Sequence, residues 1–235
     1  MPYPFAHPAA ILPLVGPMGR CAVPSALVIG SIAPDLWYLL PSLARDDSHS
    51  LAGLAGFCLP AGLIAYLAFH LLLKQPLLAL LPQAIASRLA AVATGGLPRA
   101  PWSAVVVSLL AGASTHLLWD AATHDRYVVH GFQVLQHAST LLGTAALAWW
   151  LRRWLRRAAR SPLPPGLLLS PSIRRGTLAL LAVLSLGWAL AGADALHLPR
   201  SVDEAREILR TTGMAGVQAL AMSTIGYAML WKLVR

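Results

Sequence analysis

The sequence is poor in charge, and its acidic residues are especially few. Charged side chains make up 11% of its 235 residues, whereas soluble globular domains average about 25%. Hydrophobic residues make up 57% of the chain, and the mean hydropathy is +0.64. This composition excludes an ordinary soluble domain and indicates a membrane protein.

Cysteine is scarce, and a recognisable secretory signal is lacking. The two cysteines, Cys21 and Cys58, form neither a CxxC pair nor a zinc-ribbon spacing, so they indicate neither a redox compartment nor a metal. The N-terminus has no basic n-region, and Pro17 and Arg20 interrupt its apolar stretch. We therefore expect residues 1–50 to remain in the mature protein.

Basic residues outnumber acidic ones by 18 to 9, which gives a net charge of +9. Directly after the apolar residues 147–151 comes a cluster of arginines, Arg152, Arg153, Arg156, Arg157 and Arg160. A basic cluster beside a membrane span more often sets orientation or contacts anionic lipid than binds nucleic acid. We therefore expect membrane lipid, and no nucleic acid, as a partner.

Several apolar segments are predicted to span the membrane, which takes about 20 residues of helix. They are residues 51–73, 103–119, 138–151 with flanking residues, 177–196 and 214–233. Lys74 is predicted to end the first span, and residues 75–102 to form an interfacial helix and a linker. The earlier apolar pieces, 8–15 and 22–33, are too short to span. Glycine and proline between them predict a helical hairpin that returns His7 and Asp35 to one level.

The predicted fold is all-α, a polytopic transmembrane helical bundle of about five spans with an N-terminal helical hairpin. It divides into a membrane-embedded metal-site domain (1–160), a Pro-rich linker (161–176) and a C-terminal pair of transmembrane helices (177–235). Basic residues beside the spans favour the cytoplasm. With these residues cytoplasmic, the spans alternate without conflict, and the loops that carry histidine and aspartate fall on the outer side.

Residues 116–124 carry the clearest chemical pattern. At about 100° per helical residue, Asp120 lies about 40° and His124 about 80° round the helix axis from His116. Two imidazoles and a carboxylate on one helix face suit a divalent metal such as zinc. A buried polar patch that pairs with itself is the alternative.

The acidic residues of the first 160 positions gather near histidines. They are Asp35, Asp46, Asp47, Asp120 and Asp125, and all lie in or beside histidine-bearing loops. Ionisable groups at membrane depth are costly, which makes them a functional hypothesis. Asp35 can instead form a turn or cap a helix. His7, His49 and His137 can be ordinary loop or interfacial residues.

The order of these residues resembles that in known hydrolases. His7, Asp35, His49, His116-x3-Asp120, His124 and His137 follow the ligand order of the zinc-dependent phospholipase C and fungal single-strand nuclease superfamily, an all-α fold with a tri-zinc cluster. The chain is also similar to LexA-regulated membrane-bound metal-dependent hydrolases. It resembles more closely an uncharacterised bacterial membrane family. The shared motifs are His7-Pro8-Ala9, Pro34-Asp35, Ser48-His49-Ser50, the stretch from His116 to Asp120, Thr123-His124 and Gln136-His137. The likeness covers roughly residues 5–155.

The resemblance implies a set of metal ligands. Asp35, His49, His116 and Asp120 would hold one ion, Asp120 would bridge to a second ion that His7 also binds, and His124 and His137 would bind a third. Leu141 stands where the superfamily has a glutamate, and the chain lacks the superfamily's ligating N-terminal tryptophan. We therefore expect one to three divalent ions, zinc or alternatively manganese, with one or two favoured.

The resemblance and the position of the site together predict a membrane-bound metal-dependent hydrolase of phosphoesters, phospholipid headgroups among them, in the bacterial inner membrane. Asp35 is expected to be the catalytic carboxylate, which orients a metal-activated water or accepts its proton. Ser48, Trp119 and Thr123 are expected to orient the imidazoles. The alternatives are a non-enzymatic protein with a structural metal site or a buried polar network, and a transporter.

Overall fold

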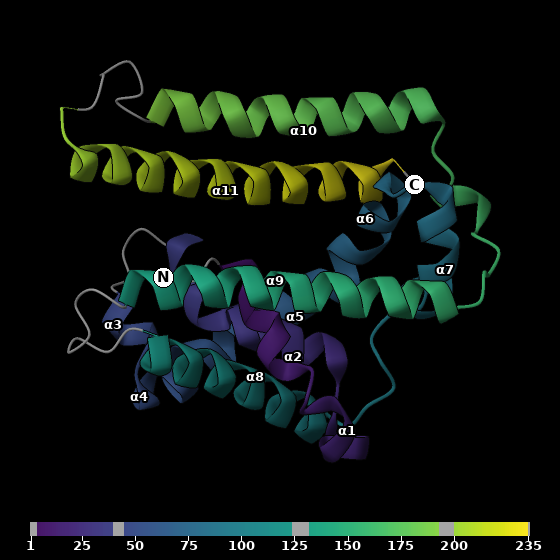
Figure 1. The fold of residues 1–235 in the computed structure, drawn as a ribbon. Helices are drawn as coiled ribbons and strands as arrows, with labels where there is room; N and C mark the ends of the chain where they lie inside the picture. The colour runs from purple at the N-terminus through teal and green to yellow at the C-terminus, as the bar shows by residue number, and fades with distance from the viewer. Residues whose placement is uncertain (1–3, 40–44, 124–131, 193–199, 235) are drawn as a thin grey trace. The chain divides into compact units, whose positions relative to one another are not determined.

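The computed structural model describes residues 4–39, 45–123, 132–192 and 200–234. Helices dominate these ranges, and none of the residues in them forms a β-strand, so the prediction of an all-α fold is confirmed. The chain forms two compact units (Figure 1). The first joins Met1–Ala68 to Leu97–Ala158, and the second joins Phe69–Gly96 to Ala159–Arg235.

The first unit begins with short helical segments that fold back on one another. They are η1 (Pro4–Ile11), α1 (Val15–Met18), η2 (Gly19–Cys21), α2 (Pro24–Ile32) and η3 (Ala33–Leu39), of which η1, η2 and η3 are 3-10 helices. Gly19 has a φ of 52°, and the pieces Val15–Cys21 and Pro24–Leu39 lie at 115° to each other. The chain reverses where the glycine and proline pattern predicts it, and η1 packs against α2.

A continuous helix of 30 residues covers Leu51–Leu80. It consists of α4 (Leu51–Gly53), η4 (Leu54–Cys58), α5 (Leu59–Ala68), η5 (Phe69–Leu73) and α6 (Lys74–Leu80), and η4 and η5 are π-helical turns. Pro60 and Pro76 each lie shortly after a π-helical turn. Such a turn changes the register of the backbone hydrogen bonds, so a proline can follow without ending the helix.

Lys74 was predicted to end the first span, and the helix itself continues beyond it to Leu80. The Lys74 side chain is buried, and its ammonium donates to the Gly96 carbonyl oxygen at 2.7 Å and to Nδ1 of His70 at 3.1 Å. The charged group is therefore solvated by protein atoms of its own unit. A lysine satisfied in this way does not have to mark the boundary between apolar helix and water.

The helix α8 (Trp102–Thr123) crosses α2 with the two backbones in contact. A Cβ added at Gly30 would lie 2.2 Å from the Leu109 carbonyl oxygen, and one added at Gly112 would lie 2.3 Å from the Leu27 carbonyl oxygen. Glycine is the residue that fits such a close approach, and small residues join membrane helix pairs in the same way.

Ser108 fixes the register of this crossing. Its hydroxyl accepts a hydrogen bond from the Val23 N–H and donates one to the Cys21 carbonyl oxygen, each at 2.9 Å. The two bonds use backbone groups of the residues just before α2, at the end of η2 and at the N-cap of α2. As a consequence, the C-terminal end of α2 and the beginning of η3 lie against the second half of α8.

Four helices are long and apolar enough to cross a membrane, namely Leu51–Leu80, Trp102–Thr123, Pro171–Ala191 and Glu207–Leu233, and the bent N-terminal pair would make a fifth if it is one broken span. The helix α9 (Phe132–Arg157) covers the predicted third span and ends in the arginine cluster. Within the described chain α9 does not meet the same criterion. Gln136 and His137 lower the hydropathy of its first half, and the arginine cluster lowers it at the other end.

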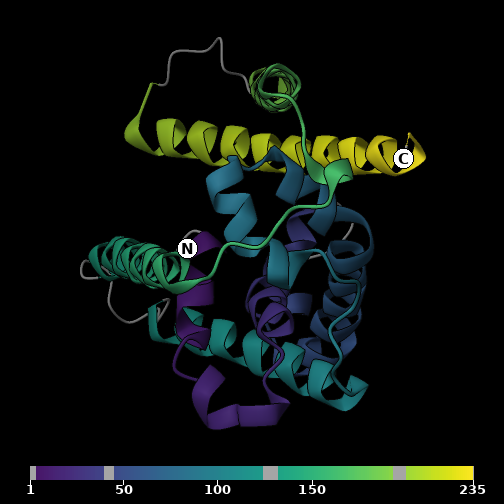
Figure 2. The ribbon, with the colours of Figure 1, turned by 90° about the vertical axis from the view of Figure 1, so that its right-hand side faces the viewer.

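The second unit combines α6 with the C-terminal part of the chain. It also contains α7 (Gln83–Ala93), η6 (Pro165–Leu167), α10 (Pro171–Gly192) and α11 (Val202–Leu233). The long helices α10 and α11 pack against each other and run in opposite directions in the view of Figure 1, and Figure 2, in which α10 is seen end-on, shows that they cross at an angle. Leu78, Ala86 and Leu167 form a small core, and the Tyr227 hydroxyl donates to the Pro76 carbonyl oxygen at 3.4 Å. Residues 69–96 thus pack with the predicted C-terminal helix pair.

Candidate metal centre

The first unit brings together five of the predicted ligands, which are His7, Asp35, His49, His116 and Asp120. They come from four parts of the chain. His7 lies on η1, Asp35 on η3, and His49 between α3 (Arg45–Ser48) and α4, while His116 and Asp120 lie one turn apart on α8. The N-terminal hairpin and the crossing of α2 with α8 create this arrangement.

Asp120 lies between the other ligands and faces them with both carboxylate oxygens. Its Oδ2 lies 3.7 Å from Nε2 of His49 and 3.8 Å from Nε2 of His116. Its Oδ1 lies 3.7 Å from Nε2 of His7. The same side chain therefore contacts two groups of ligands, one with His49 and His116 and the other with His7.

Asp35 completes the group around His49 and His116. Its Oδ1 lies 3.5 Å from Nε2 of His49 and 3.8 Å from Nε2 of His116. Good N–H···O hydrogen bonds measure about 2.7–3.2 Å, so these separations are long for direct bonds. Two ligand atoms about 2.1 Å from a tetrahedral zinc ion lie roughly 3.4 Å apart. The spacing suits ligands around an ion better than ligands bonded to each other.

Two sets of donor atoms are close enough to share a metal ion. One set is His7, His116 and Asp120, and the other is Asp35, His49 and His116; within each, the donor atoms lie within 4.8 Å of one another. Buried histidine and aspartate groups of the first unit could thus hold a metal ion. Imidazole nitrogen and carboxylate oxygen are ligands that zinc accepts, and other divalent metals accept them as well.

The orientation of His116 is fixed by the backbone of α2. Its Nδ1 lies 2.8 Å from the Ser31 carbonyl oxygen, and because a carbonyl can only accept, Nδ1 carries the proton. In the neutral ring Nε2 then has a lone pair. This atom is fully buried and has no hydrogen-bond partner among the described residues. Leaving such an atom unsatisfied costs about 1–3 kcal/mol, and a metal ion would satisfy it.

His49 is held by its neighbours in a short loop. The Ser48 hydroxyl lies 2.8 Å from Nδ1 of His49, which leaves Nε2 on the side of the two carboxylates. The thiol of Cys58 donates to the Ser48 carbonyl oxygen at 3.3 Å, and the Ser50 hydroxyl accepts from the Gly53 N–H at 2.9 Å. These contacts position the imidazole before any ligand binds.

His7 is placed by the packing of η1. Its ring stacks on that of His116, with the centroids 3.7 Å apart and the planes 19° apart. The neighbouring Ala6 packs closely against α9, where a Cβ at Gly143 would lie 3.2 Å from the Ala6 carbonyl oxygen. The 3-10 helix is thus held between α8 and α9, and His7 is 2% exposed.

The remaining predicted residues differ in their placement. His137 is exposed on α9 and belongs to neither donor set, while His124 lies outside the described residues. Leu141, which stands in place of the superfamily's glutamate, is exposed. The third ion predicted for His124 and His137 stays a prediction.

Three residues were expected to orient the imidazoles, and Ser48 does contact His49. The Thr123 hydroxyl donates to the Trp119 carbonyl oxygen at 2.9 Å. The Trp119 indole nitrogen is buried without a hydrogen-bond partner in the described part of the chain. Sequence reasoning missed the Ser31 carbonyl and the Cys58 thiol. The signal for the Ser31 carbonyl would have been Gly30 and Gly112, because their lack of a side chain permits the close crossing of α2 and α8.

A largely apolar cavity of about 590 Å³ opens beside the ligands. It is lined by His49, Leu51, Leu54, Ser114, Leu117, Leu118, Asp120 and Ala121. Two of the ligands, His49 and Asp120, therefore face a space that a small molecule can enter. Leu51 and Leu118 are among the most exposed leucines of this unit, at 85% and 70%.

Comparison with protein families gives one match, and it covers nearly the whole chain. Residues 1–230 match a family described as "Domain of unknown function (DUF4184)". The chain belongs to this family. Curated proteins and solved structures give no match. The DUF4184 match assigns no activity, so the function has to be inferred from the donor atoms and the cavity.

Proposed function

We propose that this DUF4184 protein is a membrane-bound metal-dependent hydrolase that acts on phosphoesters, phospholipids among them. The observation that carries the proposal is the buried Nε2 of His116, which has no hydrogen-bond partner among the described residues and faces Asp35 and Asp120 at 3.8 Å. A polar network without a metal would be expected to close these gaps to hydrogen-bond length. The resemblance to zinc-dependent phospholipase C and to LexA-regulated hydrolases agrees with this interpretation.

The metal is proposed to be zinc, held by Asp35, His49, His116 and Asp120. Asp120 would share a second ion with His7, because its other carboxylate oxygen faces that imidazole. Two buried carboxylates carry negative charge that a divalent cation would balance in a region of low dielectric. A bound zinc ion would supply a water of lowered pKa and a positive charge for the phosphoryl oxygens.

Asp35 is proposed as the residue that orients the attacking water or accepts its proton. It is 9% exposed and its Oδ1 already faces two imidazoles, so its Oδ2 is the oxygen left to orient a water or to accept its proton. The Ser48 hydroxyl and the Ser31 carbonyl would keep the imidazoles of His49 and His116 in their ligating orientation.

The surroundings of the donor atoms support a lipid substrate. His116 and Asp120 lie in the last two turns of a helix that can cross a membrane, so they lie near the end of its apolar part. The cavity that reaches Asp120 is lined mainly by leucine and alanine. A phosphodiester could meet the carboxylates while its apolar chain lies along Leu117 and Leu118. We place the site on the outer face of a bacterial inner membrane.

A structural metal site is the second candidate. The five ligands are all poorly accessible, as expected of ions that serve only to hold helices together. The cavity beside His49 and Asp120 argues for an open coordination position. The two candidates differ in whether the metal-loaded protein turns over a phosphodiester.

The test combines metal analysis with an activity assay. Purified wild-type protein is expected to contain at least about one equivalent of zinc or manganese and to release a phosphorylated headgroup from phosphatidylcholine or phosphatidylglycerol micelles. Asp120→Ala should lose both the metal and the activity. Asp47→Ala removes an exposed aspartate from the short helix α3 before His49 and serves as the control that keeps both.

Absence of metal from both the wild-type protein and the Asp47→Ala variant would refute the metal centre. Retention of metal with no hydrolysis of either lipid, or of a chromogenic phosphodiester, would leave the structural site as the better account.

A further inference from the structure

The second unit contains a pocket that the proposed reaction does not use. It has a volume of about 330 Å³ and is lined by Gln75, Thr94, Pro164, Gly166, Leu167, Trp231 and Lys232. These residues come from α6, the end of α7, η6 with its preceding turn, and the last turn of α11. All of them belong to the same compact unit.

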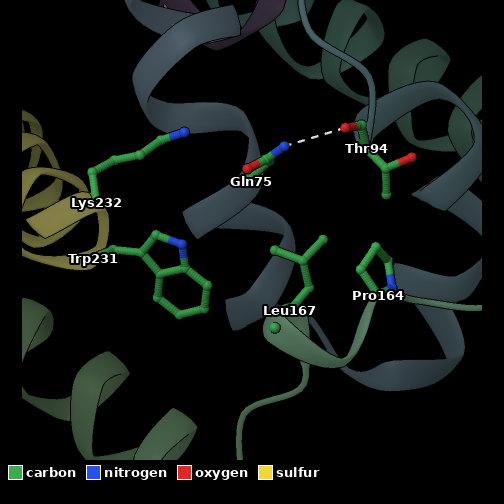
Figure 3. Close-up of a pocket in the computed structure, with 7 residues that line it drawn as sticks. Gln75, Thr94, Pro164, Leu167, Trp231 and Lys232 are labelled. Carbon is green, nitrogen blue, oxygen red and sulfur yellow. Dashed lines mark hydrogen bonds between the residues drawn. The ribbon is translucent and has the colours of Figure 1, made fainter. Parts of the chain in front are cut away.

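The pocket has one polar end and one apolar end. Figure 3 shows the Lys232 ammonium and the Gln75 carboxamide on one side, and the Trp231 ring facing Leu167 on the other. Gln75 donates to the Thr94 carbonyl oxygen at 3.2 Å, which holds its carboxamide in place. Trp231 packs edge to face on Tyr227, with 6.0 Å between the ring centroids. The contact with Tyr227 thus holds the Trp231 ring in place.

At the end of the second unit that contains Lys232, the charged side chains among the described residues are basic. The four acidic residues of the second unit, Asp194, Asp203, Glu204 and Glu207, all fall within residues 194–207. From Glu207 to Lys232 the helix α11 rises roughly 38 Å at 1.5 Å per residue, which is several Debye lengths at physiological salt. Among the described residues, neither Lys232 nor the buried Lys74 has a carboxylate within ion-pair distance.

The pocket lies where a membrane surface would be. Lys232 is close to the end of the apolar helix Glu207–Leu233, and tryptophan and lysine are the residues that collect at such boundaries. The antiparallel pairing in Figure 1 puts the first turns of α10, with Arg174 and Arg175, at the same end as Lys232. A ligand here would meet positive charge on one side and apolar surface on the other.

We propose that this pocket binds one anionic phospholipid, with the headgroup phosphate at Lys232 and Gln75 and an acyl chain against Trp231, Leu167 and Pro164. A free anion would gain nothing from the apolar end, and a zwitterionic lipid would bring a second cation toward Lys232. The site is separate from the metal centre and does not depend on the proposed hydrolysis. Its role is to hold an anionic lipid at this end of α11.

The experiment uses brominated lipids, which quench tryptophan on contact. The full-length protein is reconstituted in phosphatidylcholine vesicles that contain either brominated phosphatidylglycerol or brominated phosphatidylcholine at equal bromine content. Wild-type protein should be quenched more by the anionic lipid, and the excess should fall in Trp231→Phe by the share that Trp231 contributes. Lys232→Ala should weaken the preference about fivefold, as expected for the loss of one cation at the membrane surface, and Lys232→Arg should keep it.

Arg175→Ala is the matched control. It removes one exposed positive charge from the same end of the unit without touching the pocket, and it should keep the excess quenching. The proposal would be overturned by equal quenching by the two brominated lipids in wild-type protein, or by equal losses in Lys232→Ala and Arg175→Ala. Removal of the effect by inorganic phosphate at constant ionic strength would also overturn it, because that would indicate a soluble-anion site. Asp120→Ala should leave the lipid preference unchanged.

Discussion

Replacing Gly112 with alanine should force α2 away from α8 and weaken the metal centre. The added Cβ would lie 2.3 Å from the Leu27 carbonyl oxygen and 2.7 Å from the Ser31 nitrogen, whereas ordinary contacts of a Cβ atom begin at 3.4 Å. Both obstacles are backbone atoms, so no side chain can turn aside to make room. The two helices would have to separate by about 1 Å, which a closely packed interior resists.

The expected effect on stability follows from this overlap. Overpacking of this kind costs about 1–3 kcal/mol, and 1 kcal/mol shifts the Tm of a chain of this size by about 2–4 °C. We therefore expect the Tm of Gly112→Ala to fall by about 2–12 °C. The Ser31 carbonyl would move with α2, which lengthens its 2.8 Å bond to His116. Loss of a partner that orients a ligating histidine typically lowers metal affinity about 10- to 100-fold.

Thermal unfolding in detergent and competition for zinc with a chelator measure the two effects. Gly187→Ala is the matched control, because it lies inside α10 and has no atom within 4 Å of the added Cβ. It should unfold at the wild-type temperature or slightly above it, since alanine is favoured over glycine in a helix by about 1 kcal/mol. Zinc affinity and Tm that are the same in the two variants would refute the close crossing and its link to His116.

Two further predictions concern individual contacts of the site. His7→Ala should remove at most about one of two zinc equivalents, because His7 faces Oδ1 of Asp120 while the ligands around Oδ2 stay in place. Loss of all zinc, measured by mass spectrometry of the intact protein, would show a single shared ion instead. Cys58→Ala should lower the affinity for zinc about tenfold, because it frees the backbone before His49. Cys58→Ser keeps a hydrogen-bond donor and should lower the affinity less. Equal zinc affinities in the two variants would contradict a role for the bond from Cys58 to Ser48.

The parts of the fold that could be predicted from the sequence rest on local patterns. The helices could be predicted from apolar segments of spanning length. The chain reversal that returns His7 to the level of Asp35 could be predicted from the glycines and proline at residues 16–19. The spacing of His116 and Asp120 placed both on one face of α8. These inferences need only helix periodicity and backbone preferences, which operate within a few residues.

The parts that could not be predicted depend on contacts between distant residues. The helix continues past Lys74 because the Gly96 carbonyl, 22 residues away in the chain, accepts a hydrogen bond from its ammonium. The partner of His116 is a backbone carbonyl 85 residues earlier, and residue type alone does not reveal which carbonyl is available. The first half of α9 is a different case, because its polar residues are visible in the sequence. Its low hydropathy argues from the sequence alone against a membrane span there.

The crossing of α2 and α8 connects the packing of these apolar helices to the chemistry of the site. Between membrane helices the hydrophobic effect gives little driving force, so association depends on close backbone packing and interhelical hydrogen bonds. Here Gly30 and Gly112 allow that packing, and the same contact brings the Ser31 carbonyl to His116 and Asp35 to within 3.8 Å of the His116 ring nitrogen. A bound ion would in turn join α8 to η3 and to the His49 loop. Metal binding and helix packing would therefore stabilise each other, since an ion that binds only the assembled ligands shifts the equilibrium toward the packed state.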